Sequence, residues 1–241
     1  MLIDNKFVFV KIPKNASTSV QNSLFFNDIK VEQKDDEIDA INISNREKIR
    51  SGQFYDVSNY HQHISVLYGL FPKEKYPYIG IKRDSTERFI SAFKHVLLKA
   101  ERGTHHPKVD FSKFEENDII EYFKPVMQKI STTIGINDNH FEIVKEYFCD
   151  DENEIENSSW MMLVKNFQSQ YFWGINECDF IFDFNNLGEF ENFLSVNLKK
   201  NFKLLHQNST QELQTGIKKT DKLDEFVYNY IDSPFLEKKL L

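Results

Sequence analysis

The first candidate for chemistry is a lysine followed closely by small hydroxyl residues. Residues 6–24 read KFVFVKIPKNASTSVQNSL, so an apolar run breaks at a proline and Lys14 then precedes Ser17, Thr18 and Ser19. The run is typical of a buried parallel strand, and STSVQNSLFF is typical of a helix. A loop that enters a helix presents unpaired N–H groups and the positive end of the helix dipole. With an ammonium and hydroxyl donors added, we interpret the stretch as a phosphate-binding loop.

This loop differs from the ordinary nucleoside-triphosphate loop. The pattern G-x-x-x-x-G-K-S/T needs flanking glycines and a lysine next to the hydroxyl residue. Here Lys14 precedes Thr18 by four residues, and the loop contains no glycine. On spacing alone, a capped helix with a solvated Lys14 explains the stretch equally well, so a second signal is needed.

A second strand-loop-helix pattern covers residues 75–100, KYPYIGIKRDSTERFISAFKHVLLKA. YIGIK is typical of a strand, and a helix is expected from Ser85 to Ala100. Arg83 stands at the end of the strand, and Ser91 lies about two turns into the helix. At the carboxyl end of adjacent parallel strands, this pair could hold a second phosphate near the first.

Together the two patterns resemble the cofactor motifs of sulfotransferases. In that family F/V-x-x-I-P-K-x-A/G-G/S-T-S holds the 5'-phosphosulfate of 3'-phosphoadenosine 5'-phosphosulfate (PAPS), and R-D-P-x-x-R-x-x-S-x-F/Y holds its 3'-phosphate. This chain has FVKIPKNASTS and RDSTERFISAF. Ser17, in place of a glycine, is more similar to the uronyl 2-O-sulfotransferases, and Ser85 replaces a proline, which affects loop rigidity. The resemblance implies cofactor contacts from Lys14, Asn15, Ala16, Ser17, Thr18, Ser19, Arg83 and Ser91.

A pair of histidines lies between the two motifs, in SNYHQHISVLYGL. His61 and His63 are two residues apart, so in an extended segment both point to the same side. Taken alone, they fit polar edge positions or one satisfied core histidine. The segment is similar to the Y-H-G-H-V stretch of uronyl 2-O-sulfotransferases. That resemblance implies that His63 is the catalytic base, with His61 as its partner or substitute.

The implied reaction suits these residue types. A neutral imidazole can take the proton of a sugar hydroxyl as the bond to sulfur forms. Lys14 can stabilise the charge on the bridging oxygen as 3'-phosphoadenosine 5'-phosphate (PAP) leaves, while the loop amides hold the sulfuryl oxygens. The scheme requires no metal, and the family resemblance implies none.

The carboxyl half carries weaker signals. FQSQYF and FIFDFNNLGEFENFLSVNL are similar to stretches of carbohydrate sulfotransferases, although core packing explains their Phe and Leu equally well. LLHQNSTQEL resembles the late family loop that closes over the cofactor. This makes Asn208, Ser209 and Thr210 candidate contacts, and a solvated turn explains each of them equally well.

Composition places these motifs in a globular α/β protein. The chain has 241 residues, of which 40% are hydrophobic, and a net charge of −7 that argues against a nucleic-acid binder. No apolar stretch approaches the ~20 residues that span a bilayer. Cys149 and Cys178 are expected to be free thiols, and the adjacent His105 and His106 are not expected to bind a metal. The alternating patterns predict a three-layer α/β domain over residues 1–241 with a central, mainly parallel sheet flanked by helices. The family resemblance implies that this domain has the P-loop-like sulfotransferase fold.

We therefore predict an enzyme that moves a sulfuryl group from PAPS to a hydroxyl of a carbohydrate. Because the sequence shows neither a bilayer-spanning stretch nor a basic segment followed by a long apolar one at its start, we expect a cytoplasmic enzyme. Its small size and its Phe-, Asn-, Ile- and Lys-rich composition look bacterial, which suits sulfation of a capsular or cell-surface sugar precursor. One alternative is a P-loop kinase of a small metabolite, which needs acidic Mg²⁺ ligands. Another is a non-catalytic module that binds a nucleotide or glycan. The acceptor and the oligomeric state stay open.

Overall fold

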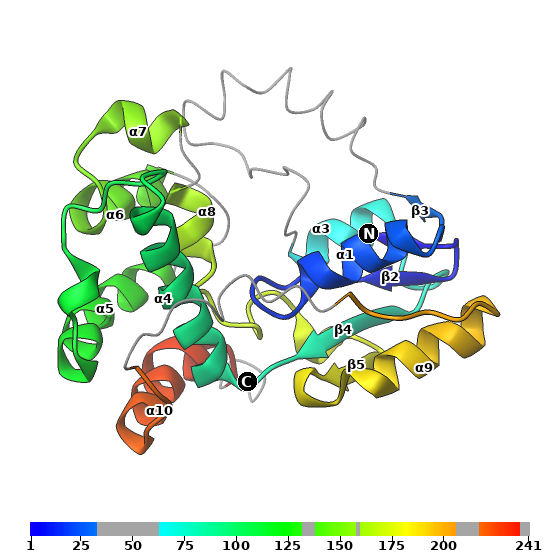
Figure 1. Ribbon diagram of the computed structural model, residues 1–241. Coiled ribbons are helices and arrows are strands. Elements are labelled where there is room, and N and C mark those ends of the chain that lie inside the picture. The colour runs from blue at the N-terminus through cyan, green and yellow to red at the C-terminus, as the bar shows by residue number, and fades with distance from the viewer. Residues whose placement is uncertain (33–62, 132–137, 158–159, 206–216, 237–241) are drawn as a thin grey trace. The chain divides into compact units, whose positions relative to one another are not determined.

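The computed structural model describes residues 1–32, 63–131, 138–157, 160–205 and 217–236 (Figure 1). These residues form two compact units. The sheet unit comprises the described parts of Met1–Ile41, Val57–Asp84 and Gln170–Asn208, and the helical unit comprises those of Ser85–Ser169 and Ser209–Leu241. The single domain expected over residues 1–241 stays a prediction. His61, Asn208, Ser209 and Thr210 lie outside the described residues.

Among the described residues, five strands form one mixed sheet in the order β3-β1-β2-β4-β5. The central and edge strands β2, β4 and β5 run parallel, whereas β1 is antiparallel to β2 and to β3. The apolar run after Lys6 thus pairs with YIGIK as parallel neighbours, which brings the ends of both strands to one edge of the sheet. The strands are β1 (Leu2–Ile3), β2 (Phe7–Phe9), β3 (Val31–Glu32), β4 (Tyr78–Lys82) and β5 (Phe180–Asp183).

Helices α1 (Ser17–Phe26) and α9 (Leu187–Leu198) cover one face of the sheet. Side chains alternate along a strand, so Ile79 and Ile81 of β4 point to the same face. Both isoleucines belong to a buried cluster with apolar side chains of α1 and α9. This packing fixes α1, and therefore the loop that precedes it, against the carboxyl end of β4.

The opposite face is covered by α3 (Ile64–Leu70) and by the short helix η2 (Ile175–Glu177). The ring of Tyr78 meets that of Tyr68 edge-on, with 5.0 Å between the centroids. Gly80 lies so close to a side chain of η2 that there is no room for a Cβ atom. With helices on both faces, the sheet unit has three layers.

The helical unit packs around a cluster of phenylalanines. The ring of Phe89 lies 5.4 Å from those of Phe123 and Phe167 and 5.6 Å from that of Phe226, so three helices and a loop meet at one side chain. Its elements are α4 (Ser85–Glu101), η1 (Phe111–Lys113), α5 (Glu116–Ser131), α6 (Asp138–Tyr147), α7 (Glu152–Asn157), α8 (Trp160–Lys165), α10 (Asp221–Val227), η4 (Tyr228–Asp232) and α11 (Ser233–Leu236).

The α/β class and the mainly parallel centre of the sheet are confirmed. Helix α1 and strand β4 have the predicted bounds, and α4 extends one residue beyond its predicted end. Pro125 lies inside α5, which continues past it to Ser131. The buried Val126 and Met127 that follow the proline anchor this second half in the core, which offsets the lost backbone hydrogen bond.

Gly174→Ala should destabilise the protein strongly. Gly174 has a φ of +92°, and an added Cβ would lie 2.3 Å from a side-chain carbon of Ile64 in α3. We expect strain and overlap to lower the free energy of unfolding by about 2–4 kcal/mol. Gly69→Ala is the matched control, because nothing lies within 4 Å of its added Cβ. It should stabilise α3 by about 0.5–1 kcal/mol. Urea denaturation measures both, and equal effects of the two variants would contradict the packing described.

Candidate functional site

The loop after β2 has an unusual backbone that leaves the N-terminus of α1 open. Lys14 and Ala16 have φ angles of 65° and 60°, in the left-handed region that non-glycine residues rarely adopt. Ala16 is the N-cap and has no side-chain acceptor, so it cannot cap the first turn. The first bond of the helix runs from the Val20 N–H to the Ala16 carbonyl, at 2.9 Å. The N–H groups of residues 17–19 therefore have no acceptor within the helix, and such groups can donate to an anion outside it.

The hydroxyl residues of this turn differ in their access to solvent. Thr18 is exposed, Ser19 is partly exposed and Ser17 is buried. A second lysine of the loop, Lys11, is used inside the protein, because its ammonium donates to Gln21 of α1 at 2.7 Å. Lys14 is partly exposed and lies two residues before the N-cap, and its role toward an anion stays a prediction.

The hydrogen-bonding edge of β4 extends beyond the end of β2. The N–H groups of Val8 and Val10 donate to the carbonyls of Pro77 and Ile79, at 3.0 and 2.9 Å. Alternate residues of a strand present their N–H and C=O groups to the same neighbouring strand. The carbonyl of residue 81 and both backbone groups of residue 83 therefore face the side of β4 on which β2 lies. The main chain turns away after Val10, and these groups need other partners.

Two side-chain amides supply those partners. Nδ2 of Asn15 donates to the Ile81 carbonyl at 2.7 Å. Gln170 bonds Arg83 in both directions: its Oε1 accepts the Arg83 N–H at 3.1 Å, and its Nε2 donates to the Arg83 carbonyl at 2.7 Å. Asn15 Nδ2 also donates to Gln170 Oε1 at 3.0 Å, and both amides are 1% exposed. The amides thus continue along β4 the hydrogen bonding that β2 begins.

The Arg83 side chain joins the two predicted cofactor motifs. Its Nη1 donates to the carbonyl of Lys14 at 3.2 Å, and its guanidinium carbon lies 4.2 Å from the ring centroid of Phe184. The sheet unit therefore brings Lys14, the open turn of α1 and Arg83 together. Ser91, the remaining residue of the second motif, lies in α4 of the helical unit and is 7% exposed. That Ser91 shares a phosphate with Arg83 stays a prediction.

His63 is the N-cap of α3. Its Nδ1 accepts the N–H of Ser65 at 3.1 Å and lies 2.7 Å from the Ser65 hydroxyl. With Nδ1 accepting, the neutral ring carries its proton on Nε2. With Nδ1 protonated and donating to the hydroxyl, Nε2 has the lone pair that a base needs. Burial lowers the pKa of His63, partly opposed by Glu177 and by a hydrogen bond to the backbone of Phe172, so the ring is neutral at physiological pH.

Two residues have roles that the sequence did not indicate. Gln170 belongs to FQSQYF, a stretch whose resemblance to carbohydrate sulfotransferases indicates no role for it, yet its amide is bonded to both motifs. The side chain of Asn15 is buried and bonds Ile81 and Gln170, and its N–H donates to the Ile12 carbonyl at 3.3 Å. The expected contact of Asn15 with the cofactor stays a prediction. No local pattern signals either role, because the partners are mostly backbone atoms of a distant strand.

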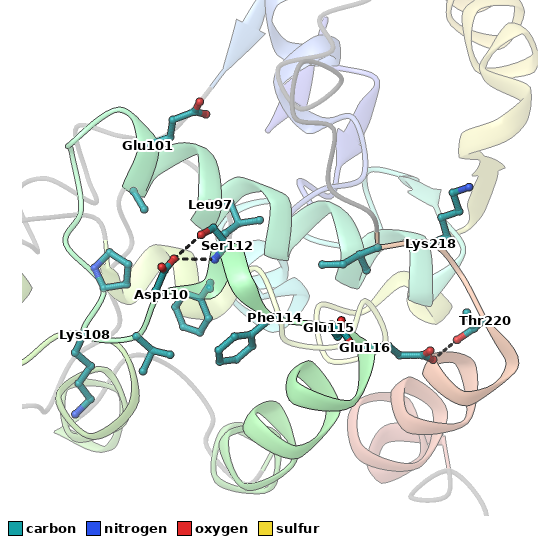
Figure 2. A pocket seen from close by; sticks show the side chains of 15 residues that line it. Leu97, Glu101, Lys108, Asp110, Ser112, Phe114, Glu115, Glu116, Lys218 and Thr220 are labelled. Carbon is teal, nitrogen blue, oxygen red and sulfur yellow. Dashed lines mark hydrogen bonds between the residues drawn. The ribbon is translucent and has the colours of Figure 1, made fainter.

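The helical unit contains a cavity of about 1150 Å³ (Figure 2). Its apolar lining includes Phe111 and Phe114, and four carboxyl side chains border it. The ammonium of Lys108, which also lines it, is held by Asp150 at 2.9 Å, and Figure 2 shows it directed away from Asp110. The four carboxyl groups outnumber the two lysines of the lining, Lys108 and Lys218, so the cavity disfavours an anionic ligand such as an adenosine bisphosphate.

The histidines and cysteines outside the site have structural surroundings. His105 is buried, with its ring 5.0 Å from that of Trp160, and His106 pairs with Glu154 at 2.9 Å. Within the described ranges, no group of three or more His, Cys, Asp or Glu side chains could hold a metal ion. Burial raises the pKa of the free Cys178 thiol to about 12.

No helix in the part of the chain that the structure describes is long and apolar enough to cross a membrane.

Comparison with known families gives a match over nearly the whole chain. The model of the sulfotransferase family matches residues 1–240, and the chain belongs to this family. Comparisons with curated proteins and with solved structures found no match. The resemblance drawn from the two motifs is thereby confirmed at the level of the family, and the α/β sheet with its flanking helices is a sulfotransferase fold. Family membership supports sulfuryl transfer in general.

The pKa of His63 can be tested through stability. Because the folded pKa lies below the unfolded value near 6.5, the unfolded chain binds more protons between the two. His63 should therefore cost no stability above pH ~6.5 and should destabilise the fold as pH falls toward its folded pKa. His63→Asn keeps a capping side chain without a titrating group. We expect melting temperatures of the wild type to fall more steeply than those of this variant from pH ~7 to ~5, and parallel curves would contradict the assignment.

Proposed function

We propose that the protein transfers the sulfuryl group of PAPS to a hydroxyl of a carbohydrate. The observation that carries this proposal is the open N-terminus of α1, which lies beside Lys14, whose carbonyl accepts a hydrogen bond from Arg83. Backbone N–H groups, an ammonium and hydroxyls on one turn suit the 5'-phosphosulfate. The Arg83 guanidinium suits the 3'-phosphate, to which we also assign Ser91.

Each residue of this site has a distinct task in the proposed reaction. PAPS, when bound, supplies an activated sulfuryl group whose transfer leaves PAP. The N–H groups and hydroxyls of Ser17, Thr18 and Ser19 hold the phosphosulfate oxygens in place. Lys14 stabilises the negative charge that gathers on the bridging oxygen as the S–O bond breaks. His63 takes the proton of the acceptor hydroxyl as the new S–O bond forms. For Nε2 to act as the base, the ring must adopt the tautomer in which Nδ1 donates to the Ser65 hydroxyl and no longer accepts the Ser65 N–H.

The proposed acceptor is an uncharged sugar hydroxyl. The histidine segment resembles that of sulfotransferases that act on sugars, and this is the feature that favours a carbohydrate. The net charge of −7 disfavours a strongly anionic polysaccharide over a neutral or small acceptor. We assign Asn208, Ser209 and Thr210 to the loop that covers the cofactor.

Ligand-induced stabilisation tests the cofactor. PAP at 100 times its Kd should stabilise the wild type by about 2.7 kcal/mol, which raises the melting temperature by about 5–10 °C. Lys14→Ala and Arg83→Ala should lose most of this shift. Lys6→Ala is the control, because Lys6 pairs with Asp4 at the other end of β2. A shift with ATP and Mg²⁺ but none with PAP would replace the proposal with the kinase alternative.

Sulfate transfer from labelled PAPS to a panel of neutral glycans tests catalysis. His63→Ala should lower kcat by about 10²–10⁴-fold, the range of general-base catalysis, while the Kd for PAP stays unchanged. His61→Ala shows whether the second histidine substitutes for the first. A wild type that binds PAP without turnover on any acceptor would favour the non-catalytic module, and an active His63→Ala variant would remove His63 from the base role.

A further inference from the structure

We propose that Gln170 is a positioning residue that holds the two cofactor motifs in register. It accepts from Arg83 and Asn15 through one oxygen and donates to the Arg83 carbonyl through its nitrogen. Asn15 belongs to the first motif and Arg83 to the second, so one buried amide is bonded to both. The link of this role to PAPS rests on the function proposed above, whereas the positioning itself rests on the hydrogen bonds alone.

A carboxamide is the side chain that this position requires. Both the N–H and the C=O of Arg83 point toward Gln170, so a partner must accept and donate at once, as a residue of a neighbouring strand does. Glutamine has this pair of groups on one planar end, glutamate has only acceptors, and methionine has neither. The 1% exposure of Gln170 leaves little room for water to replace it.

Loss of the Gln170 amide would also affect the groups proposed to contact the ligand. Residue 83 is the first residue after β4, and its guanidinium donates to the Lys14 carbonyl at 3.2 Å. Asn15, held by the Gln170 oxygen, is the residue between Lys14 and the N-cap of α1. Loss of the amide therefore loosens the backbone of Arg83 and the loop of Lys14 together, although Gln170 itself is not a ligand contact.

Amide hydrogen exchange tests the positioning without any ligand. In folded Gln170→Met, the exchange rates of the Arg83 amide and of residues 14–19 should rise at least tenfold, while that of the Val8 amide in β2 stays unchanged. Gln170→Glu keeps an acceptor for the Arg83 N–H but loses the donor to the Arg83 carbonyl, so exchange at Arg83 should rise in this variant too, and it serves if the methionine variant does not fold. Unchanged exchange at Arg83 in a folded variant would overturn the proposal.

Binding of PAP then tests the functional consequence. We expect Gln170→Met to weaken PAP binding at least tenfold by calorimetry. Asn27→Ala is the matched control, because the Asn27 amide joins the other end of α1 to the Ser23 and Lys203 carbonyls, at 2.7 and 3.3 Å. It should lower the melting temperature and leave the affinity for PAP unchanged. An equal loss of affinity in both variants would assign the effect to general stability and overturn the positioning role.

The two readouts separate the failure of this proposal from that of the proposed function. A wild type that does not bind PAP refutes the cofactor assignment, and the exchange measurement still decides whether Gln170 orders the two motifs. If the wild type and folded Gln170→Met bind PAP with equal affinity, the positioning role is refuted and the cofactor assignment stays intact.

Discussion

The need of β4 for hydrogen-bonding partners beyond the end of β2 is the constraint on which the site depends. Buried N–H and C=O groups without partners are costly, so a strand that outlasts its neighbour must be completed by other groups. Here the completing groups are the side-chain amides of Asn15 and Gln170. Because these amides replace a strand, the main chain after β2 can turn away and form a loop without leaving β4 unsatisfied.

Because the main chain can turn away after β2, it can form the strained turn that enters α1. Lys14 and Ala16 adopt left-handed conformations, which cost about 1 kcal/mol or more for residues with a Cβ atom. Asn15 stands between them and is held at Ile81 and Gln170, so its hydrogen bonds offset part of this strain. The result is a helix without a side-chain cap, with Lys14 two residues before the N-cap. The segment to which we assign anion binding is thus the same one that completes β4.

The local features of the fold could be predicted from the sequence. The bounds of α1 and β4 follow from apolar periodicity and from the proline and charged residues at their ends, and the alternation of such patterns gives the α/β class. The anion-binding chemistry of the loop stays a prediction, because an ammonium and hydroxyls at a helix start also fit a capped helix with a solvated lysine, and the second motif was needed to favour a ligand.

Long-range features could not be predicted. Gln170 lies 155 residues from Asn15, and its other partner atoms belong to the backbone, so no residue pattern marks it. His63 was read as one of two histidines on an extended segment, whereas its Nδ1 caps α3, which depends on where that helix begins. A proline inside a helix commonly ends or kinks it, and the buried residues after Pro125 anchor the continuation of α5. In each case tertiary packing, and not local preference, sets the outcome.

The most direct test is an experimental structure of the chain with PAP bound. The account predicts that oxygens of the 5'-phosphate lie within about 3 Å of the N–H groups of residues 17–19, with the Lys14 ammonium on the same phosphate and the Arg83 guanidinium on the 3'-phosphate. It also predicts that Asn15 and Gln170 keep their bonds to β4. A bisphosphate bound elsewhere, with the first turn of α1 facing solvent, would contradict the account.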